Sequence, residues 1–307
     1  PSGVTQAMVT GARQLGVKII RRCRATDITQ LPSGEWRVDT EQGAIRCEHV
    51  VNAGGTYARQ MGEWSGLQLP MTSMTHHYFV TDTVPEFMDL DRELPVIRDD
   101  REVSGYIRME QKSGLIGIYE KENPNTVWED HCPWEAENEL FEADYDRVMP
   151  WLENALERMP IFANAGIKRI VNGAIPHTPD ANPLLGPAGG LKNYWMCNGA
   201  SIGIAQGAGC GKYLAQWMVH GEADINMAGL DPRRFGRWAD ADYVRARSIE
   251  DYEHMYALHL PGEERPAGRG KRKSSLYDIL AEAGGLYTTA SGWEQVKYYA
   301  LDGQDEE

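Results

Sequence analysis

The stretch His49-Val50-Val51-Asn52-Ala53-Gly54-Gly55 is an apolar run that ends in small residues, which predicts a buried strand followed by a tight turn. The residues before this stretch predict a helix over 4–15, a strand over 17–22 and short strands at 25–28, 36–40 and 44–47. A helix, a strand, a meander and a final strand of this kind form the second half of a nucleotide-binding α/β unit. The fold class predicted for this part of the chain is therefore α/β.

The first half of such a unit is absent from the sequence. No Gly-x-Gly-x-x-Gly stands between a strand and a helix, so the usual pyrophosphate-binding turn either lies upstream of Pro1 or does not exist. Pro1 is not an initiator methionine, and the chain begins next to the predicted helix. We therefore expect this sequence to be an internal fragment of a longer polypeptide.

A second, β-rich region is predicted between residues 66 and 164. Residues 71–81 alternate in polarity, and 106–110 and 115–119 predict a hairpin with its turn at 111–114. Apolar residues at helical spacing over 144–159 predict an amphipathic helix that packs on this sheet. Beyond residue 226 the chain is polar, with a basic, Pro/Gly-rich linker at 265–273 and a further helix beginning at 277–283.

Length, charge and cysteine content exclude several classes of protein. The 307 residues exceed what one hydrophobic core usually organises, so at least two domains are expected. A formal net charge of −14 opposes nucleic-acid binding, because phosphates must be met by clustered cations. No apolar run approaches the roughly 18 residues of a membrane helix. The five cysteines form no Cys-x-x-Cys pair, so we expect neither a disulfide framework nor a metal site.

A glycine pattern marks the segment around residue 200. Gly199, Gly203, Gly207 and Gly211 recur every four residues, so on a helix they would form a stripe almost without side chains. Each helical glycine costs about 1 kcal/mol relative to alanine, so a compensating contact is expected. One interpretation is a helix whose N-terminal amides face the pyrimidine end of a flavin. Close packing against another helix, without a ligand, explains the pattern equally well.

Two pairs of polar residues in the predicted strands are candidates for chemistry. His76 and His77 are adjacent in a strand and so point to opposite faces, which opposes joint metal chelation. Either could serve as an acid or base, although a purely structural role is the commoner one for a strand histidine. Tyr106 and Arg108 share one face and could bind a small anion together, or simply stack at the surface.

Several separated runs in the same order resemble one family across nearly the whole chain. They are His76-His77-Tyr78-Phe79-Val80-Thr81, Arg92-Glu93-Leu94-Pro95-Val96-Ile97-Arg98-Asp99, Thr178-Pro179-Asp180, Pro183-Leu184-Leu185-Gly186-Pro187 and Gly209-Cys210-Gly211-Lys212-Tyr213-Leu214. In these runs the sequence resembles the dimethylglycine and sarcosine dehydrogenase family.

This resemblance implies an FAD-binding domain of the glutathione-reductase type, a β-rich substrate domain and a glycine-cleavage-T-like folate domain. Residues 1–65 and 165–225 would be the later parts of the FAD domain, residues 66–164 the substrate domain, and 226–307 the linker and start of the folate domain. Most of the folate domain, which would hold tetrahydrofolate, and the histidine that attaches FAD covalently would lie outside this sequence.

The resemblance also implies roles for individual residues. His76 would be the catalytic base that accepts the substrate's ammonium proton, and Tyr106 would position the substrate. Arg108 would pair with the substrate carboxylate. The residues expected at FAD are Ala25, Ala53, Gly54, Gly199, Ala200, Ser201, Ile202 and Gly203.

The function implied is oxidative demethylation of an N-methyl amino acid, with a hydride passing from the N-methyl carbon to FAD. The iminium product would yield formaldehyde or pass to tetrahydrofolate, and electrons would go to oxygen or an electron-transfer flavoprotein. We expect neither a nucleic-acid nor a membrane partner, and a bacterial cytoplasmic location or the mitochondrial matrix. Another amine or amino-acid oxidase of the same fold, and a non-catalytic folate-binding paralogue, remain alternatives.

Overall fold

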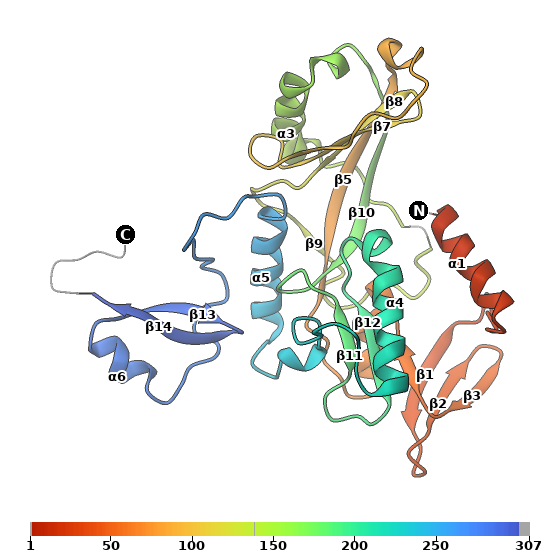
Figure 1. The fold of residues 1–307 in the computed structure, drawn as a ribbon, viewed down its shortest axis with the longest axis vertical. Coiled ribbons are helices and arrows are strands. Elements are labelled where there is room, and N and C mark those ends of the chain that lie inside the picture. The colour runs from red at the N-terminus through yellow and green to blue at the C-terminus, as the bar shows by residue number, and fades with distance from the viewer. Residues whose placement is uncertain (1, 138, 301–307) are drawn as a thin grey trace. The chain divides into compact units, whose positions relative to one another are not determined.

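The computed structural model describes residues 2–137 and 139–300 of the chain (Figure 1). Its contacts divide into two compact units, one made of residues 1–69 and 181–234 and the other of 70–180 and 235–307. The first unit combines helices with small sheets, and the second is built on one larger antiparallel sheet. This mixture of helices and sheets is the predicted α/β class. None of the described helices is long and apolar enough to cross a membrane.

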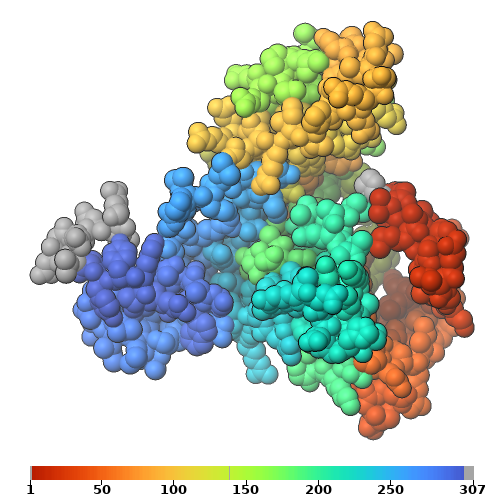
Figure 2. All heavy atoms as spheres, viewed as in Figure 1, coloured from red at the N-terminus to blue at the C-terminus, as the bar shows by residue number. Residues whose placement is uncertain are grey.

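The first unit opens with a helix and an antiparallel meander, as the sequence predicts. These elements are α1 (Ser2–Gln14), β1 (Ala25–Gln30), β2 (Trp36–Thr40) and β3 (Gly43–Cys47), with the strands in the order β1-β2-β3. Helix α1 buries no side chain, and its atoms (red) stand at the surface in Figure 2.

The strand predicted over residues 17–22 is wrong. Gly16 adopts a φ of 89°, and the Val17 backbone N–H donates to the Ala12 carbonyl, which closes helix α1 rather than starting a strand. Arg22 then takes a φ of 53°, a left-handed conformation that strands do not use. The side chains of Val17 and Ile20 are exposed, so the apolar residues of this segment have no core to enter.

A second sheet of the first unit brings together distant parts of the sequence. It has the order β11 (Leu184–Pro187), β12 (Tyr194–Asn198) and β4 (Val50–Asn52), and β12 runs parallel to β4. Strand β4 leads into a short 3-10 turn (Gly55–Tyr57) and α2 (Ala58–Glu63), whereas β12 leads into α4 (Gly203–His220). The predicted strand after His49 and the predicted helix after residue 199 are both confirmed, but the strand buries only Val50 and Asn52, and Val51 is exposed.

The sheet of the second unit contains the predicted long strand and hairpin. Its order is β10 (Ile167–His177), β5 (Thr72–Thr83), β8 (Ser113–Ile118), β7 (Gly105–Glu110) and β6 (Ile97–Asp99), with β9 (Thr126–Val127) also paired to β5. The hairpin turn is tighter than predicted, because Glu110 already pairs with Ser113.

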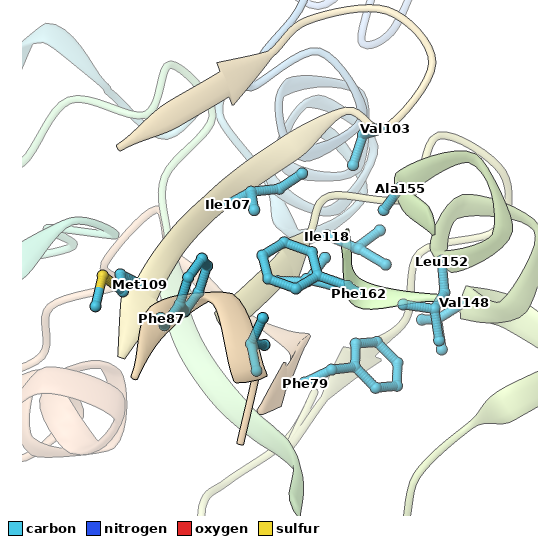
Figure 3. Packing of buried hydrophobic residues seen from close by; sticks show 12 residues of the cluster. Phe79, Phe87, Val103, Ile107, Met109, Ile118, Val148, Leu152, Ala155 and Phe162 are labelled. Atoms are coloured by element: carbon cyan, nitrogen blue, oxygen red, sulfur yellow. The ribbon is translucent and has the colours of Figure 1, made fainter. Parts of the chain in front are cut away.

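One face of this sheet carries the main hydrophobic core (Figure 3). Phe79 of β5 and Ile107 of β7 pack there against the amphipathic helix α3 (Tyr145–Arg158), which presents Val148, Leu152 and Ala155. Two 3-10 turns, Pro85–Phe87 and Pro160–Phe162, add their phenylalanines. Asp144 caps the helix by accepting a hydrogen bond from the Arg147 backbone N–H. The helix predicted over 144–159 is thus confirmed.

The opposite face of the sheet contacts a helix that the sequence analysis did not predict, α5 (Ala241–Glu253). Asp240 caps it by accepting from the Tyr243 backbone N–H at 3.0 Å. The residues of the expected linker pack on this helix: Arg265 pairs with Asp251 at 2.8 Å, and the Ala267 N–H donates to Glu250. A last 3-10 turn (Pro232–Arg234), the confirmed helix α6 (Tyr277–Glu282) and the hairpin of β13 (Gly285–Ala290) and β14 (Trp293–Tyr299) complete the described elements.

The boundaries of the two units differ from the expected domain boundaries in two segments. Residues 167–177 form β10, which pairs with β5 from Ile167 to His177, so this segment lies with residues 70–164. Residues 226–234 lie in the first unit, where the Leu185 N–H donates to the Leu230 carbonyl. The cofactor and substrate roles of the two units stay predictions.

Candidate active site

His76 lies in β5 on the face that contacts α5, with only 8% of its surface exposed. Its Nε2 is 3.2 Å from the Tyr106 hydroxyl oxygen, and its Nδ1 is 3.2 Å from that of Tyr252 in α5. The ring also lies 4.3 Å, centroid to centroid, from Tyr119. The structure therefore brings the two predicted catalytic residues, His76 and Tyr106, into direct contact.

Tyr106 reaches His76 by lying across the neighbouring strand β8. Its cross-strand partner is Gly117, and a Cβ placed on that glycine would lie 2.0 Å from Tyr106 Cζ. Only a residue without a side chain leaves room for the tyrosine ring at this point, because real Cβ atoms do not approach so closely. Gly117 is thus a requirement of the site that the sequence pattern did not reveal.

A buried polar chain continues from His76 on its other side. The Tyr252 hydroxyl donates to Glu120 Oε2 at 2.9 Å, and Glu120 Oε1 lies 3.3 Å from Nε of Arg147 in α3. The Glu120 side chain is fully buried, and that of Arg147 is 7% exposed. Glu120 comes two residues after β8 ends and touches one helix from each face of the sheet. Sequence reasoning missed Glu120, Tyr252 and Arg147.

Burial sets the protonation of these groups. It lowers the pKa of His76 to about 3, with smaller contributions from His77 and Arg147, so the imidazole is neutral around pH 7. Burial raises the pKa of Glu120 to about 7 against the opposing effect of Arg147. It also raises the pKa of Tyr106 to about 12, which keeps the phenol protonated. The site thus presents a neutral imidazole with a phenol O–H beside it.

His77 lies on the opposite face, as the alternation of the strand predicts. Its Nε2 is 3.2 Å from the Asp144 backbone N, and its Nδ1 is 3.2 Å from Arg147 Nη2. Burial, with Arg147, lowers its pKa to about 4. His77 therefore joins β5 to the start of α3, which is a structural role.

The Arg108 guanidinium is engaged with its own strand. It forms an ion pair with Glu110 and donates from Nη1 to the Met109 carbonyl at 3.0 Å. A second cation, Arg98, stacks over Tyr256 with its Cζ 4.3 Å from the ring centroid, and the Tyr256 ring is 6.3 Å from that of Tyr106. In the register of the sheet Arg98 is the direct partner of Tyr106. Sequence reasoning did not single out Arg98.

In the first unit, two of the segments expected at FAD follow adjacent parallel strands. Ala53 and Gly54 come directly after β4, and residues 199–203 come directly after β12. The Asn198 side chain joins the two strand ends by donating to the Asn52 carbonyl at 2.9 Å. Ligands of open α/β sheets bind at this carboxyl edge. Ala25 lies elsewhere, at the start of β1 in the other sheet.

The groups at this edge have the chemistry to hold FAD. Within the described residues, three buried side-chain oxygens have no hydrogen-bond partner there: Asn198 Oδ1, Ser201 Oγ and Gln206 Oε1. Ile202 gives α4 no side-chain cap, so the helix keeps N-terminal N–H groups for an outside acceptor. Of the predicted glycine stripe, Gly203, Gly207 and Gly211 lie in α4. Apart from chain neighbours and the nearby backbone of the helix itself, no described atom comes within 4 Å of a Cβ placed there.

Packing within the first unit explains why position 54 is a glycine. A Cβ at this position would lie 2.5 Å from Met61 Sδ and 3.2 Å from the Ala58 backbone. The glycine is therefore required by the close packing of α2 on β4, whatever lies at the edge of the sheet.

Comparison with known proteins decides the family. A family model described as "FAD dependent oxidoreductase" matches residues 1–217, and one described as "FAD dependent oxidoreductase central domain" matches residues 220–274. The chain belongs to the FAD dependent oxidoreductase family. The second match includes most of the segment in which we expected a linker and the start of a folate-binding domain.

Two relatives confirm the resemblance to the dimethylglycine and sarcosine dehydrogenases that the sequence motifs indicated. Dimethylglycine dehydrogenase of Rattus norvegicus is 40% identical over 99% of the chain, and sarcosine dehydrogenase of Mus musculus is 32% identical over 97%. These alignments cover 36% and 32% of the two relatives, so the chain spans about a third of their length.

A solved structure supports the fold. L-proline dehydrogenase from P. horikoshii aligns over 75% of this chain and 58% of its own, with a TM-score of 0.63 and 21% sequence identity. The α/β fold of an FAD-binding oxidoreductase, predicted from the sequence, is therefore confirmed.

The space that Gly117 leaves for Tyr106 gives a direct test of the site. In the full-length FAD dependent oxidoreductase, Gly117→Ala should displace the Tyr106 ring and break its contact with His76, which a crystal structure would show. Relocating a packed ring typically costs about 1–3 kcal/mol, so a lower unfolding midpoint in denaturant should accompany the shift.

The matched control is Gly173→Ala, on the strand that pairs with His76 from the other side. A Cβ there meets only Leu140 Cδ2, at 3.6 Å, so the ring positions should stay unchanged. Equal behaviour of the two variants would contradict the assigned role of Gly117.

Proposed function

We propose that the full-length protein oxidatively demethylates an N-methyl amino acid of the dimethylglycine or sarcosine type. The observation that carries this proposal is the contact of the neutral, buried His76 with Tyr106 on one face of the second unit's sheet. The names of the two relatives, dimethylglycine dehydrogenase and sarcosine dehydrogenase, support the substrate class. FAD, when bound, supplies the hydride acceptor for the N-methyl carbon.

Proton removal is the task of this chain's residues. Only a neutral amine has the lone pair that stabilises an iminium, so the ammonium proton must leave before hydride transfer. Both ring nitrogens of His76 are already engaged, and Tyr106 is its only partly exposed hydrogen-bond partner among the described residues. The ammonium proton therefore passes to the Tyr106 oxygen while the Tyr106 hydrogen moves to His76 Nε2. The phenol thus both positions the amine and connects it to the base.

The FAD site is proposed at the carboxyl edge of β4 and β12. Ala53, Gly54 and the 199–203 segment would contact FAD there, with Asn198 Oδ1 and Ser201 Oγ as acceptors for its hydroxyl and N–H groups. The N-terminus of α4 would stabilise negative charge on the reduced ring. A contact of Ala25 with the adenosine portion and covalent attachment through an upstream histidine also stay predictions.

Two routes are open to each of the two products, the iminium and the electrons on FAD. The iminium hydrolyses to formaldehyde or transfers its carbon to tetrahydrofolate, and the electrons pass to oxygen or to an electron-transfer flavoprotein. Transfer to tetrahydrofolate requires the folate-binding domain that the resemblance implies, most of which would lie outside this sequence. A bacterial cytoplasmic or mitochondrial matrix location likewise stays a prediction.

Substrate turnover tests the proposed function. The purified full-length protein should be yellow, lose its flavin absorbance when mixed anaerobically with dimethylglycine or sarcosine, and release formaldehyde when an acceptor and no folate are present. Proline serves as a control amine without an N-methyl group. A colourless protein that binds folate but produces no formaldehyde would replace this proposal with the folate-binding paralogue.

The role of His76 predicts a loss of rate. His76→Ala should slow anaerobic flavin reduction by about 10²- to 10⁴-fold near pH 7, because positioned acid–base groups contribute that much. The loss should shrink as the pH approaches the pKa of the substrate's ammonium group, where the neutral amine forms without help. His77→Asn, on the opposite face, should reduce its flavin at the wild-type rate. Identical pH profiles for His76→Ala and the wild type would remove His76 from the mechanism.

Substrate binding distinguishes two arginines. If Arg108 pairs with the substrate carboxylate, Arg108→Lys should raise the substrate dissociation constant, because lysine cannot reproduce the two-pronged guanidinium contact. Arg98→Lys is the comparison variant, since Arg98 is the cross-strand partner of Tyr106. An effect confined to Arg98→Lys would transfer the carboxylate-binding role from Arg108 to Arg98.

A further inference from the structure

The hydrogen-bond chain behind His76 has a defined direction. A phenol has one hydrogen to donate, and the Tyr252 hydroxyl donates it to Glu120 Oε2 at 2.9 Å. The Tyr252 oxygen can then only accept at its 3.2 Å contact with His76, so the hydrogen in that contact belongs to Nδ1 of the imidazole. Because burial keeps His76 neutral, its other nitrogen, Nε2, carries a lone pair. That lone pair faces the Tyr106 hydroxyl.

We propose that Glu120 and Tyr252 are positioning residues that hold His76 in the Nδ1–H tautomer, so that its Nε2 lone pair is aimed at Tyr106. This inference rests on the proposed function for its catalytic meaning, but the tautomer itself is a property of the resting protein. Neither Glu120 nor Tyr252 needs to touch the substrate, because both act through His76.

The surroundings of Glu120 act on its ionisation in both directions. Arg147 of α3 lies 3.3 Å from Oε1, and Tyr252 of α5 donates to Oε2. Asp144, the cap of α3, opposes ionisation, as does burial, and together these effects place the pKa of Glu120 near 7. The carboxylate therefore titrates within the range in which the enzyme would work.

Protonation of Glu120 would reverse the direction of donation in the hydrogen bonds from Glu120 through Tyr252 to His76. A carboxylic acid can donate its own hydrogen to the Tyr252 oxygen, and the Tyr252 hydroxyl would then donate to His76 Nδ1. His76 would become the Nε2–H tautomer, with no lone pair toward Tyr106. The site could then no longer accept a proton through the phenol.

The chain also serves the proton transfer itself. When Tyr106 gives its hydrogen to His76 Nε2 and takes the ammonium proton, the imidazole becomes a cation in a buried site. The Nδ1–H bond to Tyr252, and the Glu120 carboxylate beyond it, stabilise that cation without moving a further proton. Burial, which lowers the pKa of His76 to about 3, makes this cation costly, and the contact with the chain reduces that cost.

The test uses the full-length protein and four variants, one of which, His76→Ala, serves only to assign a spectral band. Glu120→Gln removes the charge and allows an amide N–H to donate to Tyr252, and Tyr252→Phe breaks the chain. Glu250→Gln is the matched control, because Glu250 is another buried carboxylate paired with an arginine, Arg247 of α5, at 2.6 Å. Two properties are measured: the pH profile of flavin reduction, and the tautomer-sensitive imidazole bands in isotope-edited Raman spectra of histidine-labelled protein. The His76 band is assigned by its loss in His76→Ala.

The expected result is an Nδ1–H band for His76 in the wild type and in Glu250→Gln, and an Nε2–H band in Glu120→Gln. Flavin reduction in Glu120→Gln and Tyr252→Phe should fall by roughly 10²-fold at neutral pH. The rate in Glu120→Gln should also lose the ionisation near pH 7 that the wild type and Glu250→Gln retain.

An Nε2–H band in the wild type at alkaline pH would overturn the inference, and this measurement needs no variant of Glu120 that might misfold. A pH profile in Glu120→Gln identical to that of Glu250→Gln would overturn it as well. An Nδ1–H band in a protein that N-methyl amino acids fail to reduce would support the tautomer and count against the proposed function alone.

Discussion

The alternation of side chains along β5 is the constraint on which the rest of the site depends. Because successive residues point to opposite faces, His76 and His77 enter two different environments although they are neighbours in sequence. His77 is committed to α3 through Asp144 and Arg147, and His76 to α5 through Tyr252. Each histidine therefore connects the sheet to one helix, His77 to α3 and His76 to α5. Of the two, only His76 also contacts the partly exposed phenol of Tyr106.

The register between neighbouring strands determines which residues lie beside His76 on its face of the sheet. The pairing of β5, β8 and β7 places Tyr119 and Tyr106 on the His76 face, and the bare Gly117 lets Tyr106 lie across β8. Glu120 joins this group of residues because β8 ends just before it. Its side chain can therefore reach past the sheet to Arg147 of α3 and Tyr252 of α5. One register shift would separate these groups, since each residue would then face the other side.

The sequence predicted those features that depend on local pattern. Alternation over 71–81 gave the opposite orientations of His76 and His77, and the hairpin pattern gave the strand that carries Tyr106. The pattern of an apolar strand ended by glycine predicted β4, whereas its parallel partner β12 was not predicted. The strand expected at 17–22 was wrong because a C-terminal helix cap uses the Val17 N–H, which an apolar pattern alone does not reveal.

The missed residues depend on tertiary contacts. Helix α5 buries Ser248, Glu250 and Asp251 as well as Tyr252, so its inward face is polar and does not show the usual apolar stripe. The aspartate cap at Asp240 and the spacing of Val244, Ser248 and Tyr252 were the available signals. Glu120 and Arg147 are ordinary charged residues in sequence, and only the fold shows that both are buried and paired.

We propose that His76 and Tyr106 prepare an N-methyl amine for loss of hydride from its methyl carbon. The most direct test is anaerobic flavin reduction in the full-length protein with dimethylglycine deuterated either on its N-methyl groups or on its glycine methylene carbon. We expect a primary isotope effect from the N-methyl label and none from the methylene label. A primary effect from the methylene label alone would show that the enzyme oxidises the amino-acid carbon instead, and would contradict the proposed N-demethylation.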